Sequence, residues 1–229
     1  MSGLQTIIDR CNSLKINRRN VVGTQYTRNE IPRVSQTPTL NPWKLTMEMP
    51  NSFRYSDARA LMEELDTLDT YTPQLVTFGN NPNLTWIWAY QGSLTSAQIT
   101  GLTVISYVGE TLTLGGLPTV AASTVIFKKN DLIQINGHPY PFTSTTDVLR
   151  GSGTTITVTT SRPNIISTGV TGSGITVGSN CYFYLFCPNM PVYKLIPGGY
   201  QRYGNGPVLN NAIIQWSDNF YMYEWVSQA

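Results

Sequence analysis

Histidine is scarce in this chain, and this scarcity limits the chemistry that the sequence can perform. His138 is the only histidine among 229 residues. One chain therefore cannot build a multi-histidine metal site, and His138 is the only base available to a serine-histidine-aspartate triad. Because it directly follows Asn136-Gly137, a turn signal beside which polar residues are common, we expect neither catalysis nor metal binding from it.

Cysteine and glycine patterns also argue against catalysis and cofactor binding. The three cysteines are an odd number, which is unlike the disulfide framework of a small secreted domain. Cys181 and Cys187 end a strand-like run that would hold their backbones roughly 20 Å apart, so we expect buried thiols. The Gly-Ser-Gly segments at 151–153 and 172–174 lack the third glycine of a dinucleotide loop. The sequence thus predicts no catalytic residue, no cofactor and no metal.

The composition favours a protein whose surface is partly covered by neighbours. Charged residues are 12% of the chain, whereas soluble proteins average about 25%, and a solitary monomer normally keeps more charge for solubility. The net charge is +2 with scattered basic residues, so we expect no specific nucleic-acid binding. No stretch approaches the ~20 apolar residues that span a bilayer, and we expect no membrane insertion.

The first part of the chain mixes helical and strand-like patterns. Apolar residues at helical spacing predict an amphipathic helix over 3–14, whose apolar face packs on its own domain or on a neighbouring subunit. Trp43, Leu45, Met47 and Met49 alternate with polar residues, which predicts a half-buried strand. Ser56 is a typical N-cap for a helix of about three turns. Short strands are then expected over 74–78 and 84–89.

Charge nearly vanishes between residues 92 and 178, where Thr, Gly, Val and Ile dominate. Short strand patterns and turn signals predict a small barrel of the OB type. Asn136-Gly137 predicts a hairpin because both residues tolerate positive φ, and residues 165–178 are expected to form a loop. The predicted strands are 104–107, 111–114, 124–127, 132–135, 155–159 and 182–186.

The last strand of the chain presents two apolar or amphipathic faces. Residues 212–216 and 220–226 flank a turn and predict a second hairpin. A strand that wants cover on both sides either lies in the middle of a sheet or is completed by another chain. We therefore predict a subunit interface made by residues of two strands, namely Trp43, Leu45, Met47, Met49, Tyr221, Tyr223 and Trp225.

The order of these pieces resembles that of the distal tail proteins, or baseplate hub proteins, of tailed bacteriophages. The run from Lys129 to Ile135, Lys-Asn-Asp-Leu-Ile-Gln-Ile, is followed by a turn and Tyr140. It is similar to the Gly-Asp-Leu/Ile element of that family, although Asn130 stands where glycine is usual. The amphipathic N-terminal helix is a departure from the simplest members.

The resemblance implies a mainly β fold with one or two short helices. A tail-tube-like split-barrel core would comprise residues 1–91 and 188–229, and an OB-like barrel, residues 92–187, would be inserted into it. It further implies a non-enzymatic virion protein, made in the host bacterial cytoplasm. Such proteins form a ring, commonly a homo-hexamer, at the distal end of the tail tube. The ring serves as a hub for tube, sheath, baseplate or fibre proteins, and DNA passes through it.

Two other classes of function stay open. OB-like barrels with exposed aromatic residues can hold sugars, so a carbohydrate-binding receptor-recognition protein of a phage tail is the main alternative. A glycan-cleaving enzyme is the third class, because two carboxylates distant in sequence can meet in space. A ring-sized oligomer, glycan affinity, or activity that depends on one acid would distinguish the three.

Overall fold

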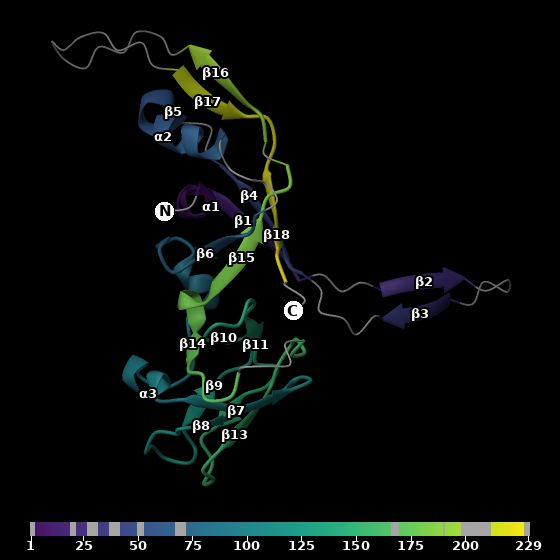
Figure 1. Cartoon of the computed structure of the whole chain (residues 1–229), viewed down its shortest axis with the longest axis vertical. Helices are drawn as coiled ribbons and strands as arrows, with labels where there is room; N and C mark the ends of the chain where they lie inside the picture. The colour runs from purple at the N-terminus through teal and green to yellow at the C-terminus, as the bar shows by residue number, and fades with distance from the viewer. Residues whose placement is uncertain are drawn as a thin grey trace. The chain divides into compact units, whose positions relative to one another are not determined.

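The computed structural model has a mainly β fold, as the sequence predicts (Figure 1). The described residues are 3–18, 22–26, 32–36, 42–49, 53–66, 72–165, 170–189, 191–197 and 212–226. The chain divides into two compact units, each described by itself. The first comprises Met1–Asn17, Trp43–Val76 and Tyr184–Glu224, and the second comprises Arg18–Pro42, Thr77–Phe183 and Trp225–Ala229. The domain ranges suggested by the resemblance stay a prediction.

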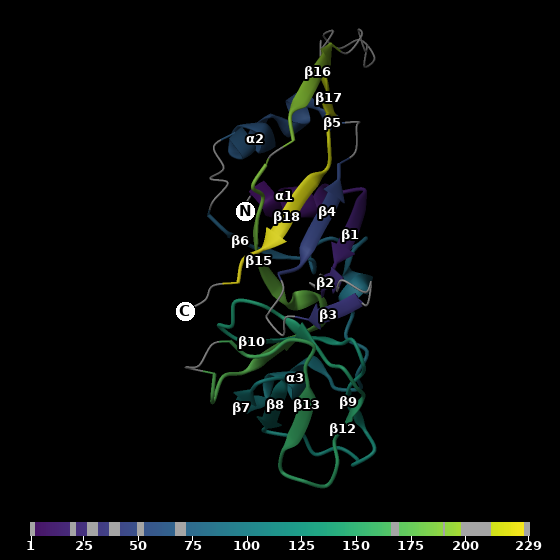
Figure 2. The ribbon, with the colours of Figure 1, turned by 90° about the vertical axis from the view of Figure 1, so that its right-hand side faces the viewer.

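A five-stranded sheet organises the first unit, and two of its strands, β6 and β15, run across the boundary between the units. Its order is β1-β4-β18-β15-β6. The helix α1 (Gly3–Arg10) lies on one side of this sheet in both views (Figures 1 and 2). The strands are β1 (Ser13–Asn17), β4 (Lys44–Glu48), β6 (Gln74–Thr77), β15 (Tyr182–Phe186) and β18 (Phe220–Glu224).

The strand β18 is central, which decides between the two alternatives left open for the end of the chain. Its residues pair antiparallel with β4 on one side, for example Met222 with Leu45, and with β15 on the other, for example Tyr223 with Phe186. Both of its hydrogen-bonding edges are therefore used within the chain. No second copy is needed to complete this strand.

The predicted hairpin over 212–226 is wrong, because its two strands join different sheets. β17 (Ala212–Trp216) lies between β16 (Tyr193–Pro197) and β5 (Phe53–Arg54). The chain bends after β17, where the Trp216 and Phe220 rings meet edge to face with centroids 4.9 Å apart. The helix α2 (Tyr55–Asp66) packs on the β17 sheet through a small core of Met62 and Ile214.

The second unit contains short strands in several open sheets and one large apolar core. Its sheets have the orders β13-β8-β7, β11-β10-β14 and β12-β9, and β2 pairs with β3. These strands are β2 (Val22–Tyr26), β3 (Pro32–Gln36), β7 (Thr103–Val108), β8 (Thr111–Gly115), β9 (Val125–Phe127), β10 (Leu132–Ile135), β11 (Phe142–Thr143), β12 (Val148–Leu149), β13 (Ile156–Thr159) and β14 (Ile175–Val177).

Several elements of the second unit differ from the sequence predictions. Residues 84–89 contain a 3-10 helix, η1 (Thr85–Trp88), instead of a strand, because the backbone N–H groups of Leu84 and Thr85 donate to the Asn81 carbonyl. The helix α3 (Ser96–Thr100) was not predicted, and with it the described residues hold three α-helices instead of one or two. The strand β14 lies within the predicted loop over 165–178, and a second 3-10 helix, η2 (Gly178–Asn180), follows it.

The Asn136-Gly137 turn exists, but it is not the tight two-residue hairpin that the dipeptide predicts. Only Gly137 has a positive φ, of 83°, and the His138 N–H donates to the Ile135 carbonyl at 2.9 Å. The strands β10 and β11 pair first at Ile133 and Phe142, so a longer loop separates them. The side chain of Gln134 occupies the intervening space, donating to the carbonyls of His138 and Tyr182.

Gly116 and Gly137 offer a test of the packing around α3. Both have positive φ, 68° and 83°, where a Cβ costs roughly 1–2 kcal/mol. A Cβ on Gly116 would also lie 2.1 Å from the Gly101 carbonyl oxygen, whereas one on Gly137 meets nothing within 4 Å. We expect Gly137→Ala to lower the free energy of unfolding by about 1 kcal/mol, and Gly116→Ala by about 1–3 kcal/mol more. Urea unfolding measures both, and equal losses would contradict the described contact.

Candidate functional site

The two faces of the five-stranded sheet differ in burial: one is buried, and the other, here called the open face, is partly exposed in the described residues. Side chains alternate along β18, so that Phe220, Met222 and Glu224 are buried while Tyr221 and Tyr223 are half-exposed. The same alternation holds along β4, where Leu45 and Met47 are buried and Lys44 and Thr46 are half-exposed. The residues of the open face that β4, β18 and β15 contribute, by the same alternation, are Lys44, Thr46, Glu48, Tyr182, Tyr184, Phe186, Tyr221 and Tyr223.

Contacts between the aromatic rings and one lysine order this open face. The Lys44 Nζ lies 4.5 Å from the ring centroid of Tyr221 and 5.5 Å from that of Tyr223. The Phe186 and Tyr223 rings pack with centroids 5.9 Å apart. A cation over an aromatic ring gains roughly 0.5–1 kcal/mol at an exposed site. The face is therefore an aromatic surface with the Lys44 ammonium over two of its rings.

The structure separates the residues of the predicted interface into two groups. Trp43, Leu45, Met47 and Met49 are buried within the chain itself. The other group is at least partly exposed: Tyr221 and Tyr223 are half-exposed, and Trp225, directly after β18, is 43% exposed. Of the predicted interface residues, only these three aromatic residues have side chains exposed enough to contact another chain.

Lys44 and Phe186 belong to the open face, but the sequence analysis did not select them. The signal was present in the alternation of β4 and β15, which places Lys44 and Phe186 opposite the buried residues. Which of the two faces is covered depends on α1, whose residues Leu4, Ile7 and Ile8 are fully buried. Strand periodicity alone does not contain this information.

His138 lies in the core of the second unit instead of on an exposed turn. Its Nδ1 lies 3.0 Å from the Tyr140 carbonyl and its Nε2 lies 3.4 Å from Asn164 Oδ1. The ring packs edge to face on Tyr140, with centroids 4.2 Å apart. Burial lowers the pKa of His138 below its ordinary value, and the neighbouring Arg162 charge lowers it further. Both neighbouring oxygens are acceptors, so a neutral imidazole donates to only one of them, and these buried contacts give His138 a structural role.

The network around His138 holds the segment Thr160–Ile165 in place. The Tyr107 hydroxyl donates to the Arg162 carbonyl at 2.6 Å, and the Tyr140 hydroxyl donates to the Pro163 carbonyl at 2.8 Å. The Asn164 side-chain amide donates to the Tyr107 carbonyl at 2.9 Å. Buried polar groups with satisfied hydrogen bonds favour one conformation of a segment over its alternatives.

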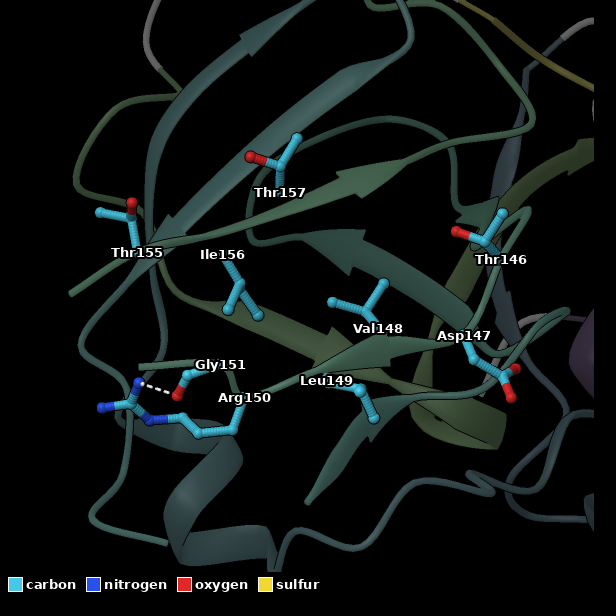
Figure 3. A pocket seen from close by; sticks show the side chains of 9 residues that line it. All are labelled: Thr146, Asp147, Val148, Leu149, Arg150, Gly151, Thr155, Ile156 and Thr157. Carbon is cyan, nitrogen blue, oxygen red and sulfur yellow. Dashed lines mark hydrogen bonds between the residues drawn. The ribbon is translucent and has the colours of Figure 1, made fainter. Parts of the chain in front are cut away.

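A shallow groove opens between β12 and β13, shown in Figure 3. It has a volume of about 310 Å³, and the buried side chains of Val148 and Ile156 lie at its centre. Arg150 is held at one end by the carbonyls of Pro118, Gly151 and Gly153. The groove is lined by Thr146, Asp147, Val148, Leu149, Arg150, Gly151, Thr155, Ile156 and Thr157.

The thiols are poor nucleophiles. All three cysteines are unpaired and buried, as predicted. Burial raises the pKa of Cys11 and of Cys187 to about 11, and it raises the pKa of Cys181 as well. Within the described segments, no group of three or more His, Cys, Asp or Glu side chains could hold a metal ion. None of the helices described is long and apolar enough to cross a membrane.

No protein-family model matches the chain, and no curated protein sequence matches it significantly. Its function must therefore be inferred from the geometry of its surfaces.

The buried His138 makes the stability of the protein depend on pH. Because the pKa of His138 is lowered in the folded state, the unfolded chain takes up a proton first as the pH falls below about 6.5. The free energy of unfolding should then decrease, by at most about 1.4 kcal/mol per pH unit. Urea unfolding between pH 7.5 and 5.5 measures this decrease. The variant His138→Gln should lose it, and an unchanged slope in the variant would contradict the assignment.

Proposed function

We propose that this chain is a structural subunit of a bacteriophage tail, without enzymatic activity. It forms a ring at the distal end of the tail tube, as a homo-hexamer, and joins the tube to baseplate, sheath or fibre proteins. In this proposal a split-barrel core carries an inserted OB-like barrel. The protein is made in the host cytoplasm and ends in the virion.

The main support for the proposal is that the two faces of the five-stranded sheet differ in burial. One face is buried against α1, while the other carries half-exposed aromatic rings around Lys44. Clusters of exposed aromatic residues commonly mark protein interfaces, where tyrosine and tryptophan are enriched. Both edges of β18 are hydrogen-bonded within the sheet, so the sheet would contact other copies of the chain through its partly exposed face. Such contacts fit an oligomer built from several copies.

The conformation of Asn130 supports the resemblance on which the proposal draws. Asn130 has a φ of 73° and is the only non-glycine residue with positive φ in the described part of the chain. Asparagine tolerates this conformation better than most residues, which explains how it can stand where the family has glycine. The Asp131 carboxylate that follows is buried and accepts hydrogen bonds from the backbone N–H groups of Gln91 and Lys128.

Assembly of the purified chain tests the proposal. Native mass spectrometry should give a ring-sized oligomer, and negative-stain electron microscopy should show an annulus. The double variant Tyr221→Asp/Tyr223→Asp should reduce the oligomer to smaller species, because it places two negative charges on the open face. Trp86→Asp is the matched control, since Trp86 is aromatic and 73% exposed in the other unit.

A monomer at all concentrations, or a ring that the double variant does not weaken, would contradict the role given to this face. Circular dichroism should show that both variants are folded, because the replaced side chains are at least partly exposed.

A second candidate function is carbohydrate recognition, and the groove between β12 and β13 favours it. Its rim offers hydroxyl groups, a carboxylate and a guanidinium, which are groups that bind sugar hydroxyls. Its volume of about 310 Å³ lies at the lower end of ordinary ligand sites.

Glycan binding tests this second candidate. A glycan array with bacterial surface saccharides should then give at least one ligand. Thr157→Val removes an exposed hydroxyl at the groove with little change in shape, and it should weaken binding of that ligand about tenfold by titration calorimetry. The control Thr103→Val removes an exposed hydroxyl on another strand. An array without any hit, or an equal loss of glycan affinity in both variants, would contradict carbohydrate recognition at this groove.

A further inference from the structure

The strand β16 forms an open edge of the sheet β16-β17-β5. It pairs with β17 along its whole length, from Tyr193 opposite Trp216 to Pro197 opposite Ala212. On its other side no strand of the described chain is paired with it. An exposed edge of this kind is a template for pairing with another chain.

The register shows which backbone groups of β16 point outward. The Ser217 N–H donates to the Val192 carbonyl at 2.9 Å, and opposite pairs in an antiparallel ladder are alternately hydrogen-bonded and not. Lys194 and Ile196 therefore bond to β17, whereas the N–H and carbonyl groups of Tyr193 and Leu195 point away from it. The Pro197 carbonyl also points away from β17, and proline has no backbone N–H to donate.

Exposed aliphatic side chains accompany this open edge. Val192 is 71% exposed, Leu195 47% and Ile196 44%, and Ile213 on the neighbouring strand is also exposed. Lys194 is the only charged residue of the strand. Natural edge strands usually carry more charge or are covered, because apolar edges associate.

We propose that β16 pairs with β16 of a second copy of this chain, antiparallel about a two-fold axis at Leu195. In this register each Leu195 N–H donates to the partner copy's Leu195 carbonyl. Each Tyr193 N–H donates to the carbonyl of Pro197, which needs no N–H of its own for this bond. The outward N–H groups of both strands are thereby satisfied.

Charge and side-chain packing select this register over its neighbour. Shifting the axis to Lys194 would also pair the outward amides, but it would place the two Lys194 ammonium groups directly opposite each other, which is destabilising. With the axis at Leu195, each Lys194 lies opposite Ile196 and the two Leu195 side chains meet. Two-fold contacts of this kind are the commonest in homo-oligomers.

The contact does not depend on the proposed ring. A two-fold axis joins two copies, so in a ring of such subunits it would join two rings back to back and would not close one ring. Loss of the contact therefore halves the mass of the assembly, whereas failure of the ring gives a dimer. The two failures are distinguishable by mass.

Sedimentation velocity over a concentration series tests the pairing with the full chain. The variant Leu195→Lys places two like charges at the axis and should raise the dissociation constant of the two-fold contact at least tenfold. The matched control Val192→Lys adds the same charge at a more exposed site outside the bonded pairs, and it should change the constant less than threefold. An association that both variants weaken equally, or that neither weakens, would overturn the proposal, as would a wild-type protein without a two-fold species.

A cysteine at the axis provides an independent measurement. Leu195→Cys places two thiols on directly opposite residues, whose Cα atoms lie about 5.5 Å apart in a hydrogen-bonded pair, within disulfide range. Mild oxidation should give a covalent dimer on a non-reducing gel. Val192→Cys should not, since its two copies would lie about 20 Å apart, and the native thiols are buried. Cross-linking of both variants to the same extent would also overturn the register.

Discussion

The first unit depends on the placement of β18 between β4 and β15. A central strand must find hydrogen-bond partners on both edges, and β18 finds them within the chain. Glu224 at its end is buried and accepts a hydrogen bond from the Trp43 backbone N–H at 3.0 Å, which ties the last strand to the start of β4. On the second face of the sheet, the aromatic side chains of β15 and β18 are partly exposed in the described residues.

The second unit combines an apolar core with a segment that is held by polar groups. Its core is a single apolar cluster, but the segment Thr160–Ile165 is held by hydroxyl, amide and imidazole groups that are mostly buried. Such groups cost free energy when they are left unpaired and favour one conformation when they are paired. The unit thus has a stable interior, and its open features are a groove and a few exposed side chains.

Two surfaces of the first unit, the open face of the five-stranded sheet and the edge of β16, can be compared by the charged residues that they carry. The edge of β16 is poor in charge, because Lys194 is the only charged residue of that strand. The open face of the five-stranded sheet instead carries both Lys44 and the exposed Glu48 of β4, and Lys44 lies over the Tyr221 ring. The β16 edge is therefore the surface better suited to burial against another chain.

The sequence by itself determined the local elements: the alternation of Trp43 to Met49 predicts β4, and the helical spacing after Gly3 predicts α1, because these patterns record which side chains must avoid water. It also determined that one chain, with a single histidine, cannot build a multi-histidine metal site. Only the tertiary structure decided the partners of each strand. Residues 212–226 read as a hairpin, yet β17 and β18 enter different sheets. Residues 84–89 read as a strand, yet they contain η1, which begins where the Asn81 carbonyl accepts the N–H groups of Leu84 and Thr85. Pairing depends on contacts between residues far apart in the chain, such as Met222 with Leu45, and no local pattern encodes them.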